Sequence, residues 1–291
     1  MLWVAPAASV NILLPRTGSI VFPHDDPGAG MADQGDIDER IRTYYREQFD
    51  EGARLTTRSS QGVLEHRRTQ ELIAEHVESG RVIDIGGATG VHALPLLQRG
   101  VEVELIDPVA EQVGKARTAG ISARVGDARD LPFADDEFDA ALMLGPLYHL
   151  SADDDRVRAL REASRVTRSG GIVFAAALSR EVAFQAATLT REPHLTSELT
   201  NLFENGAPIA GGRFPAGHFH TADELAAEVT ASGLDLIDVH GVEGPNGLLL
   251  ENVDVGNEQL TDAALALARR GSTIPGIRDL SIHLLAIARV P

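Results

Sequence analysis

The glycine-rich segment 84–90 is the part of the sequence best suited to bind a ligand. It contains the acid Asp84 together with Gly86, Gly87 and Gly90. Because glycine has no side chain, such a turn between a strand and a helix presents bare backbone N–H groups to a ligand. A lone glycine cluster is also an ordinary turn in α/β proteins, so the interpretation depends on the residues further along the chain.

Two further acids come after the next predicted strands. Asp107 lies 23 residues after Asp84 and ends the second predicted strand. An acid there can accept hydrogen bonds from both hydroxyls of a ribose. Asp127, between Gly126 and Ala128, comes after the third predicted strand, where its carboxylate can accept a hydrogen bond from an adenine amino group. The order of these acids indicates a cofactor that contains a ribose and an adenine.

The loop 144–149 carries the residues best suited to act on a substrate. His149 has a pKa type suited to general-base catalysis near neutral pH, although a histidine in a loop often only bonds neighbouring backbone. We predict Tyr148 and His149 as catalytic candidates. Tyr44 and Tyr45 lie on a predicted helix and are predicted to contact the substrate, with packing in the core as the ordinary alternative.

Four residues further along the chain are candidates for the acceptor side. Arg180 and Arg213 are able to bind an acidic substrate, although exposed arginines are common. His218 and His220 are two residues apart on a predicted extended segment and would share one face. Because no third ligand lies nearby, we expect no metal site.

The elements that position these residues alternate between strands and helices. Such alternation predicts an α/β fold, namely a Rossmann-like, doubly wound, seven-stranded and mostly parallel sheet with helical cap elements. The predicted strands are 81–85, 101–106, 122–125, 138–144, 171–177, 234–240 and 282–290. The predicted helices are 36–53, 62–77, 90–98, 109–119 and 153–167.

Residues 180–219 break the alternation, and we predict that they form an inserted cap over the ligand edge of the sheet. Thr221 and Glu224 then form a capping-box pattern that starts the next helix. Gly170 and Gly171 are expected to stop the helix before the fifth strand. The predicted organisation is a loose N-terminal extension over 1–30, a helical cap over 31–78 and a core over 79–291.

The composition excludes several classes of chemistry. The chain has 291 residues, no cysteine and a formal net charge of −17. It therefore has no disulfide, thiolate metal site or cysteine nucleophile. Its acidity disfavours nucleic acid and anionic membranes as partners. With no apolar run near the ~20 residues of a membrane span, we expect a cytoplasmic protein.

Over roughly residues 36–180 these motifs resemble the class I S-adenosylmethionine-dependent methyltransferases, in the branch of ubiquinone-biosynthesis-type small-molecule enzymes. The resemblance implies that the 86–90 turn holds the amino-acid part of S-adenosylmethionine, Asp107 the ribose and Asp127 the adenine. The family usually has glycine where this chain has Ala88. The cofactor-binding residues so implied are Asp84, Gly86, Gly87, Ala88, Thr89, Gly90, Asp107, Pro108, Gly126, Asp127, Ala128, Leu144 and Gly145.

Other functions remain open. A nicotinamide-binding oxidoreductase also uses an acid after its second strand, but its Gly-x-Gly-x-x-Gly turn serves a pyrophosphate. Here Asp84 precedes the turn, and its carboxylate suits an ammonium group better than a pyrophosphate. A non-catalytic, cofactor-binding partner subunit is another alternative. We expect methyl transfer to an O or N nucleophile of a small molecule, whose identity, like the oligomeric state, the sequence does not specify.

Overall fold

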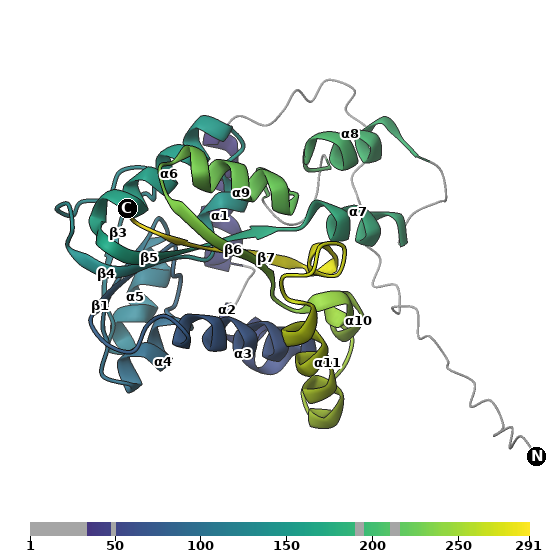
Figure 1. Ribbon diagram of the computed structural model, residues 1–291, viewed down its shortest axis with the longest axis horizontal. Helices are drawn as coiled ribbons and strands as arrows, with labels where there is room; N and C mark the ends of the chain where they lie inside the picture. The colour runs from purple at the N-terminus through teal and green to yellow at the C-terminus, as the bar shows by residue number, and fades with distance from the viewer. Residues whose placement is uncertain (1–33, 48–50, 190–194, 210–215) are drawn as a thin grey trace, which may run out of the picture.

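Seven strands form one sheet in the order β3-β2-β1-β4-β5-β7-β6 (Figure 1). Strand β7 runs antiparallel to β5 and β6, and the other pairs are parallel. The strands are β1 (Arg81–Ile85), β2 (Glu102–Asp107), β3 (Ser122–Val125), β4 (Phe138–Met143), β5 (Thr167–Leu178), β6 (Asp235–Gly241) and β7 (His283–Arg289). The predicted mostly parallel, seven-stranded sheet is thereby confirmed.

The computed structural model describes residues 34–47, 51–189, 195–209 and 216–291. The predicted extension over 1–30 and the candidate Arg213 lie outside these described residues. Within them, no helix is long and apolar enough to cross a membrane.

Alternating side chains of each strand build two cores, one on each face of the sheet. Ile83 and Ile85 of β1 point to one face, whereas Val82 points to the other. The first face is covered by α6 (Asp153–Val166) and α9 (Ala222–Ala231). The second is covered by α3 (Ser60–Ala74), α4 (Ala93–Gln98) and α5 (Ala110–Thr118). The sheet is therefore doubly wound, as predicted.

Helix α1 (Gln34–Glu47) lies at the carboxyl ends of the first strands. Its apolar stripe includes Ile37 and Ile41, which pack on Val109 at the start of α5. Within the helix predicted over 36–53, the structure describes α1 up to Glu47 and then α2 (Glu51–Ala53), which continues into a π-helical segment, η1 (Arg54–Arg58); the residues between α1 and α2 lie outside the described ranges.

The fifth strand begins earlier than predicted. Gly170 and Gly171 lie inside β5, and the pairing of β5 with β4 shifts register between Phe138 and Ala140. The two glycines therefore do not separate helix α6 from the strand. Gly170 instead uses its conformational freedom within the strand, where its φ is 78°.

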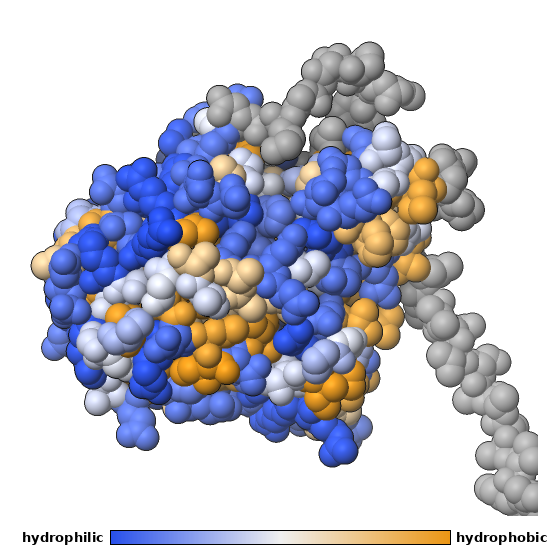
Figure 2. Space-filling model, turned by 45° about the horizontal axis from the view of Figure 1, so that its top comes forward, coloured by the Kyte–Doolittle hydropathy of each residue, from blue (hydrophilic) through white to orange (hydrophobic). Residues whose placement is uncertain are grey.

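Two helical insertions extend from the sheet. The first, in the predicted 180–219 segment, contains α7 (Arg180–Leu189) and α8 (Ser197–Asn205). It is followed by α9, whose capping box is formed by Thr221 and Glu224 as predicted. Exposed apolar side chains of the first insertion contribute to orange areas on an otherwise largely hydrophilic face (Figure 2). They are Leu189, Leu195 and Phe203.

The second insertion joins β6 to β7 and was not predicted. It contains α10 (Gly247–Leu250) and α11 (Glu258–Gly271), with short 3₁₀ turns η3 (Gly244–Asn246) and η4 (Arg278–Leu280). A small apolar cluster fixes it on α3, formed by Leu64, Leu250, Ala264 and Leu265. The backbone N–H of Ser60 donates to the carbonyl oxygen of Val253 at 2.7 Å, so the insertion is also tied to the start of α3.

Candidate cofactor and acceptor site

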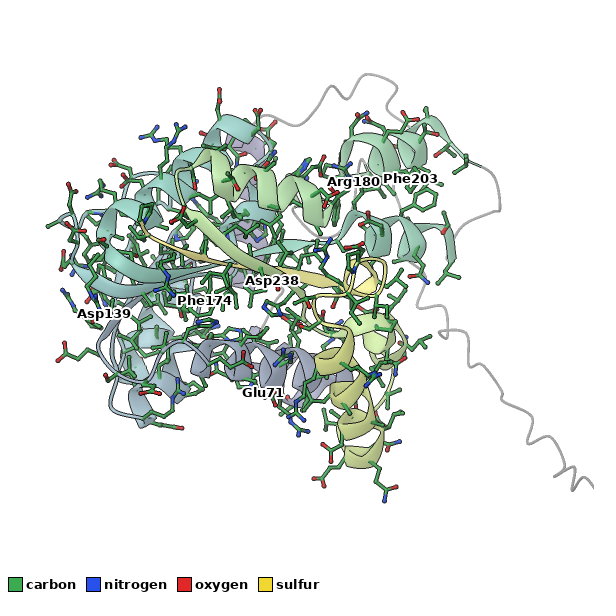
Figure 3. All side chains as sticks on the ribbon, in the orientation of Figure 1. Glu71, Asp139, Phe174, Arg180, Phe203 and Asp238 are labelled. Atoms are coloured by element: carbon green, nitrogen blue, oxygen red, sulfur yellow. The ribbon has the colours of Figure 1, made fainter. Side chains whose placement is uncertain are left out.

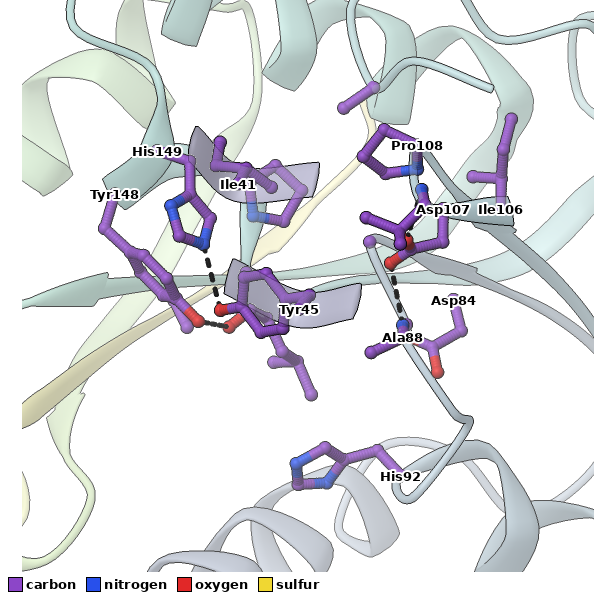
Figure 4. A pocket seen from close by; sticks show the side chains of 18 of the residues that line it. Ile41, Tyr45, Asp84, Ala88, His92, Ile106, Asp107, Pro108, Tyr148 and His149 are labelled. Carbon is purple, nitrogen blue, oxygen red and sulfur yellow. Dashed lines mark hydrogen bonds between the residues drawn. The ribbon is translucent and has the colours of Figure 1, made fainter. Parts of the chain in front are cut away.

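One pocket collects most of the predicted site residues at the carboxyl ends of the parallel strands, where open α/β sheets bind ligands (Figure 4). Helix α1 and the 3₁₀ turn η2 (Pro146–His149) form its upper wall. The predicted residues that line it are Asp84, Gly86, Gly87, Ala88, Asp107, Pro108, Gly126, Asp127, Ala128, Leu144, Gly145, Tyr45, Tyr148 and His149.

Asp84 is a buried acid at the wall of the pocket. Its Oδ2 has no hydrogen-bond partner, and the residue lines the pocket. Burial, together with the nearby carboxylate of Asp107, raises the pKa of Asp84 to about 7. A Cβ on Gly87 would collide with the Asp84 carboxylate, so glycine is required there for the turn to pass over the acid. A carboxyl group at the wall of the pocket suits an ammonium group.

Ala88 occupies a backbone conformation that glycine prefers. Its φ is 47°, in the left-handed region, and its N–H donates to Asp107 Oδ2 at 2.9 Å. For a residue with a Cβ this conformation costs about 1 kcal/mol. The chain therefore keeps the turn shape of a glycine-containing motif with alanine in the middle position.

Asp107 is held by two backbone donors. Its Oδ1 accepts from the N–H of Val109 at 2.8 Å, and its Oδ2 accepts from Ala88. Burial nevertheless raises the pKa of Asp107 to about 6. Each carboxylate oxygen retains a second lone pair, so the fixed carboxylate is able to accept hydrogen bonds from vicinal hydroxyls as well.

Asp127 is part of an ionic clamp centred on Arg129. The guanidinium bonds both oxygens of Asp127, and it also reaches Asp38 of α1 at 3.3 Å and Asp155 of α6 at 3.1 Å. Burial opposes ionisation of Asp127, but the hydrogen bonds from Arg129 hold its pKa below the usual range. The adenine contact of Asp127 stays a prediction, and Arg129 and Asp38 join the site as residues the sequence analysis missed.

Aromatic residues close the upper wall of the pocket. Tyr45 Oη and His149 Nε2 are 3.1 Å apart, and the Tyr148 hydroxyl donates to the carbonyl oxygen of Leu144 at 3.2 Å (Figure 4). The hydrogen-bonded Tyr45–His149 pair connects α1 to the loop after β4. Tyr44 is buried and does not line the pocket.

Thr89 and Gly90 belong to the turn but do not line the pocket. Gly90 has φ of 82°, and a Cβ on it would meet the side chain of Ile121. These two residues are therefore part of the turn but not of the pocket wall.

Three predicted acceptor-side residues lie elsewhere. Arg180 is the first residue of α7, and its buried side chain binds Glu224 of α9 (Figure 3). The fully buried His220 places Nε2 3.2 Å from an oxygen of Glu228, and His218 lies beside it. None of the three lines the pocket, and the contacts of Arg180 with Glu224 and of His220 with Glu228 hold the first insertion on α9.

Several pocket residues carry no recognisable sequence motif. Within the described residues the far half of the pocket, beyond the glycine turn, is lined by side chains from η1, α3, the start of α4, β5 and the β6–β7 region. They are Arg54, Glu65, Thr69, His92, Ala176, Val242, His283 and Leu285. Because they come from distant parts of the sequence, only the fold brings them together.

Comparison with known proteins agrees with this geometry. Residues 83–175 match the family model described as a methyltransferase domain. The chain is 38% identical over 98 residues to 2-methyl-6-phytyl-1,4-hydroquinone methyltransferase 2, chloroplastic, of Oryza sativa subsp. japonica, which covers 32% of this chain and 27% of that protein. It is 33% identical over 106 residues to probable tRNA methyltransferase 9B of Homo sapiens, which covers 36% and 22%. The matched region thus spans about a quarter of the length of these relatives.

A solved structure extends the likeness over most of the fold. The 1,6-didemethyltoxoflavin-N1-methyltransferase of Burkholderia thailandensis, solved with S-adenosylhomocysteine, aligns with a TM-score of 0.54 at 16% identity. The alignment covers 92% of this chain and 93% of that one, and at this identity it shows a likeness in fold alone. Residues 83–175 are therefore similar to a methyltransferase domain, and the fold of the chain is like that of an S-adenosylmethionine-dependent methyltransferase.

Proposed function

We propose that this protein transfers the methyl group of S-adenosylmethionine to an O or N nucleophile of a small molecule. The observation that carries the proposal is the buried carboxyl group of Asp84, which lines the pocket beside the glycine turn and whose Oδ2 has no hydrogen-bond partner. A buried carboxylate oxygen without a partner is costly unless a ligand satisfies it. The same oxygen disfavours the nicotinamide alternative, whose pyrophosphate it would repel.

The residues around Asp84 suit the other parts of S-adenosylmethionine. Asp84 and the turn at Gly86 would hold the amino-acid portion, Asp107 the ribose hydroxyls, and the Asp127 loop the adenine. When bound, S-adenosylmethionine supplies a methyl group whose bond to sulfur breaks as the acceptor lone pair bonds to carbon, which leaves S-adenosylhomocysteine. Tyr45, Tyr148 and His149 exclude water above this region and orient the acceptor.

A catalytic role for Tyr148 and His149 is part of the proposal. Because Tyr45 Oη shares a hydrogen bond with His149 Nε2, the pair is able to pass a proton between pocket and loop. The same hydrogen bond ties the position of α1 to that of this histidine.

The small-molecule acceptor is supported by the enclosure of the pocket and by charge. Helices α1 and α3 both contribute to the walls, and the formal net charge of −17 opposes approach of a polyphosphate such as tRNA. One relative is named as a probable tRNA methyltransferase, so tRNA is included in the test below.

Calorimetry with S-adenosylmethionine and S-adenosylhomocysteine tests the cofactor assignment directly. We expect both to bind the wild type, and Asp84→Asn and Asp107→Asn to lose affinity. Methyl transfer is then measured with radiolabelled cofactor on a panel of small phenols, amines and carboxylic acids, with bulk tRNA as a separate arm. Cofactor binding without transfer to any acceptor would instead identify a non-catalytic partner subunit, and transfer to tRNA alone would contradict the small-molecule assignment.

A further inference from the structure

A histidine–carboxylate pair lies in the half of the pocket beyond the glycine turn. His283 is the first residue of β7 and lines the pocket. Its Nδ1 is 2.5 Å from Oε1 of Glu243, which lies just beyond the end of β6 and is completely buried. Its Nε2 has no hydrogen-bond partner among the described residues. The pair therefore presents one unused imidazole nitrogen at the pocket.

The carboxylate of Glu243 is fixed by several donors. It accepts from the Ser281 hydroxyl at 3.1 Å, from the backbone N–H of His283 at 3.0 Å and from Gln61 Nε2 at 3.1 Å. The Ser281 Oγ in turn accepts from the N–H groups of Glu243 and Gly244. With these contacts the carboxylate sets the orientation and tautomer of His283, as the carboxylate does in a catalytic histidine–carboxylate pair.

The second carboxylate in this half of the pocket is already neutralised. Arg54 binds both oxygens of Glu65, at 2.5 and 2.7 Å. Gly62 makes this possible, because a Cβ on it would overlap the carbonyl oxygen of Arg54 and force the η1 segment away from α3. Burial opposes ionisation of Glu65, but Arg54 and His283 lower its pKa to about 2.

These contacts argue against a metal ion. Ligand atoms of Glu65, Glu243 and His283 lie within 4.8 Å of one another. However, the guanidinium of Arg54 occupies both oxygens of Glu65, and a cation would have to displace it. The oxygens of Glu243 are also fully bonded. The one unused donor or acceptor identified in the cluster is His283 Nε2.

We propose that His283, oriented by Glu243, accepts the proton of an acceptor hydroxyl, and that the acceptor is therefore an oxygen nucleophile such as a phenol or enol. The proposal rests on the function proposed above. With Nδ1–H directed to Glu243, the Nε2 lone pair takes the hydroxyl proton, and the electron pair of the broken O–H bond stays on oxygen. His283 is the catalytic residue in this step, and Glu243 is a positioning residue.

The surroundings favour a hydroxyl over an amine. Burial and the positive charge of Arg54 oppose protonation of His283. The carboxylates of Glu65 and Glu243 outweigh both, so the pKa of His283 is raised to about 8. At neutral pH the protonated imidazole donates to the oxygen of a bound hydroxyl and repels an alkylammonium, and the neutral fraction, which grows as pH rises toward 8, takes the hydroxyl proton. The apolar side chains of Ala176, Val242 and Leu285 complete this half of the pocket and suit an aryl ring or similar flat apolar body.

Binding to the complex with S-adenosylhomocysteine tests the proposal without a known acceptor. The probes are matched pairs, 4-hydroxyacetophenone with 4-aminoacetophenone and 3-hydroxyquinoline with 3-aminoquinoline, titrated by calorimetry. We expect at least one hydroxyl probe to bind about tenfold more tightly than its amine partner, and His283→Asn to remove that preference. The matched control is His240→Asn, because His240 lies on neighbouring β6 outside the pocket and bonds Ser272.

The pKa of His283 in the Glu243→Gln variant distinguishes a positioning role of Glu243 from a purely structural one. Histidine resonances followed by NMR against pH should show one imidazole titrating near pH 8 in the wild type, absent in His283→Asn and shifted down in Glu243→Gln. Equal binding of hydroxyl and amine probes, an unchanged preference in His283→Asn, or no binding of any probe would contradict the proposal. Failure of the wild type to bind S-adenosylhomocysteine would instead overturn the proposed function, which the first titration reports separately.

Discussion

At the scale of single residues, the buried carboxyl group of Asp84 is placed to bind the cofactor, but its ionisation destabilises the folded protein. Its pKa is raised to about 7 by burial and by Asp107, so the folded protein favours the protonated acid. The stabilisation from this group is present below its unfolded pKa of 3.8 and is lost as pH rises through 7. A bound ammonium would reverse this preference by pairing with the charged form.

Asp84→Asn should therefore have opposite effects on binding and on stability. We expect at least a 30-fold loss of affinity for S-adenosylhomocysteine, since a buried charged contact is worth about 2 kcal/mol or more. The melting temperature without cofactor should rise at pH 8 and change little at pH 4, because asparagine does not ionise. Calorimetry and thermal melts check both effects, with exposed Asp262→Asn as control. A lower melting temperature at pH 8 would contradict the assigned pKa.

Ala88 gives a second prediction at this scale. Ala88→Gly removes a left-handed strain of about 1 kcal/mol but increases the entropy of the unfolded chain by a similar amount. We expect the free energy of unfolding to change by less than about 0.5 kcal/mol and cofactor affinity to be retained. Ala88→Val should lose about 2 kcal/mol, because a β-branched residue is strongly disfavoured at this φ. Urea unfolding of both variants measures the difference.

At the scale of elements, the Arg129 clamp joins α1, α6 and the loop after β3. Arg129→Ala should release α1 from the pocket, because its contact with Asp38 is lost. We expect faster amide exchange over 34–47 and faster release of S-adenosylhomocysteine, with little change in the β-sheet. Hydrogen exchange and stopped-flow displacement measure these effects. Arg67→Ala, which removes an exposed ion pair on α3, should leave both unchanged.

The elements also show how far the sequence determines the structure. All seven strands were predicted because they alternate with helices at short spacing, and the glycine turn with Asp107 located the cofactor end because those residues come directly after strands. The β6–β7 insertion was missed because its helices pack on α3 instead of on the sheet. His283 and Glu65 carry no local pattern, since they meet only through the pairing of β7 and the position of α3.

At the scale of the whole molecule, buried acids with opposite pKa shifts determine how stability depends on pH. The pKa values of Glu65 and Glu228 are both about 2, because nearby cationic groups outweigh burial. Their stabilisation is present above pH 4.5 and is lost as pH falls toward 2. Asp84 and Asp107 act in the other direction, since their stabilisation is lost as pH rises through about 6 to 7.

The melting temperature without cofactor should therefore be highest at about pH 4, where the stabilisation from Glu65 and Glu228 is nearly complete and that from Asp84 and Asp107 is only beginning to be lost. Saturating S-adenosylhomocysteine should move this maximum toward neutral pH, because its ammonium group would favour the ionised form of Asp84. Thermal melts between pH 3 and 9, with and without the ligand, test this. A maximum at the same pH in both conditions would contradict the placement of the ammonium at Asp84.

The attachment points of the β6–β7 insertion have a consequence for the evolution of this molecule. The insertion leaves the sheet at Gly241 and returns at Leu284, which are paired residues of adjacent antiparallel strands. Glu243 and His283 lie just inside these two points, so strand pairing keeps them together whatever the length of chain between them. The intervening helices can thus gain, lose or exchange residues, and reshape the α3 side of the pocket for a different acceptor, without separating the pair.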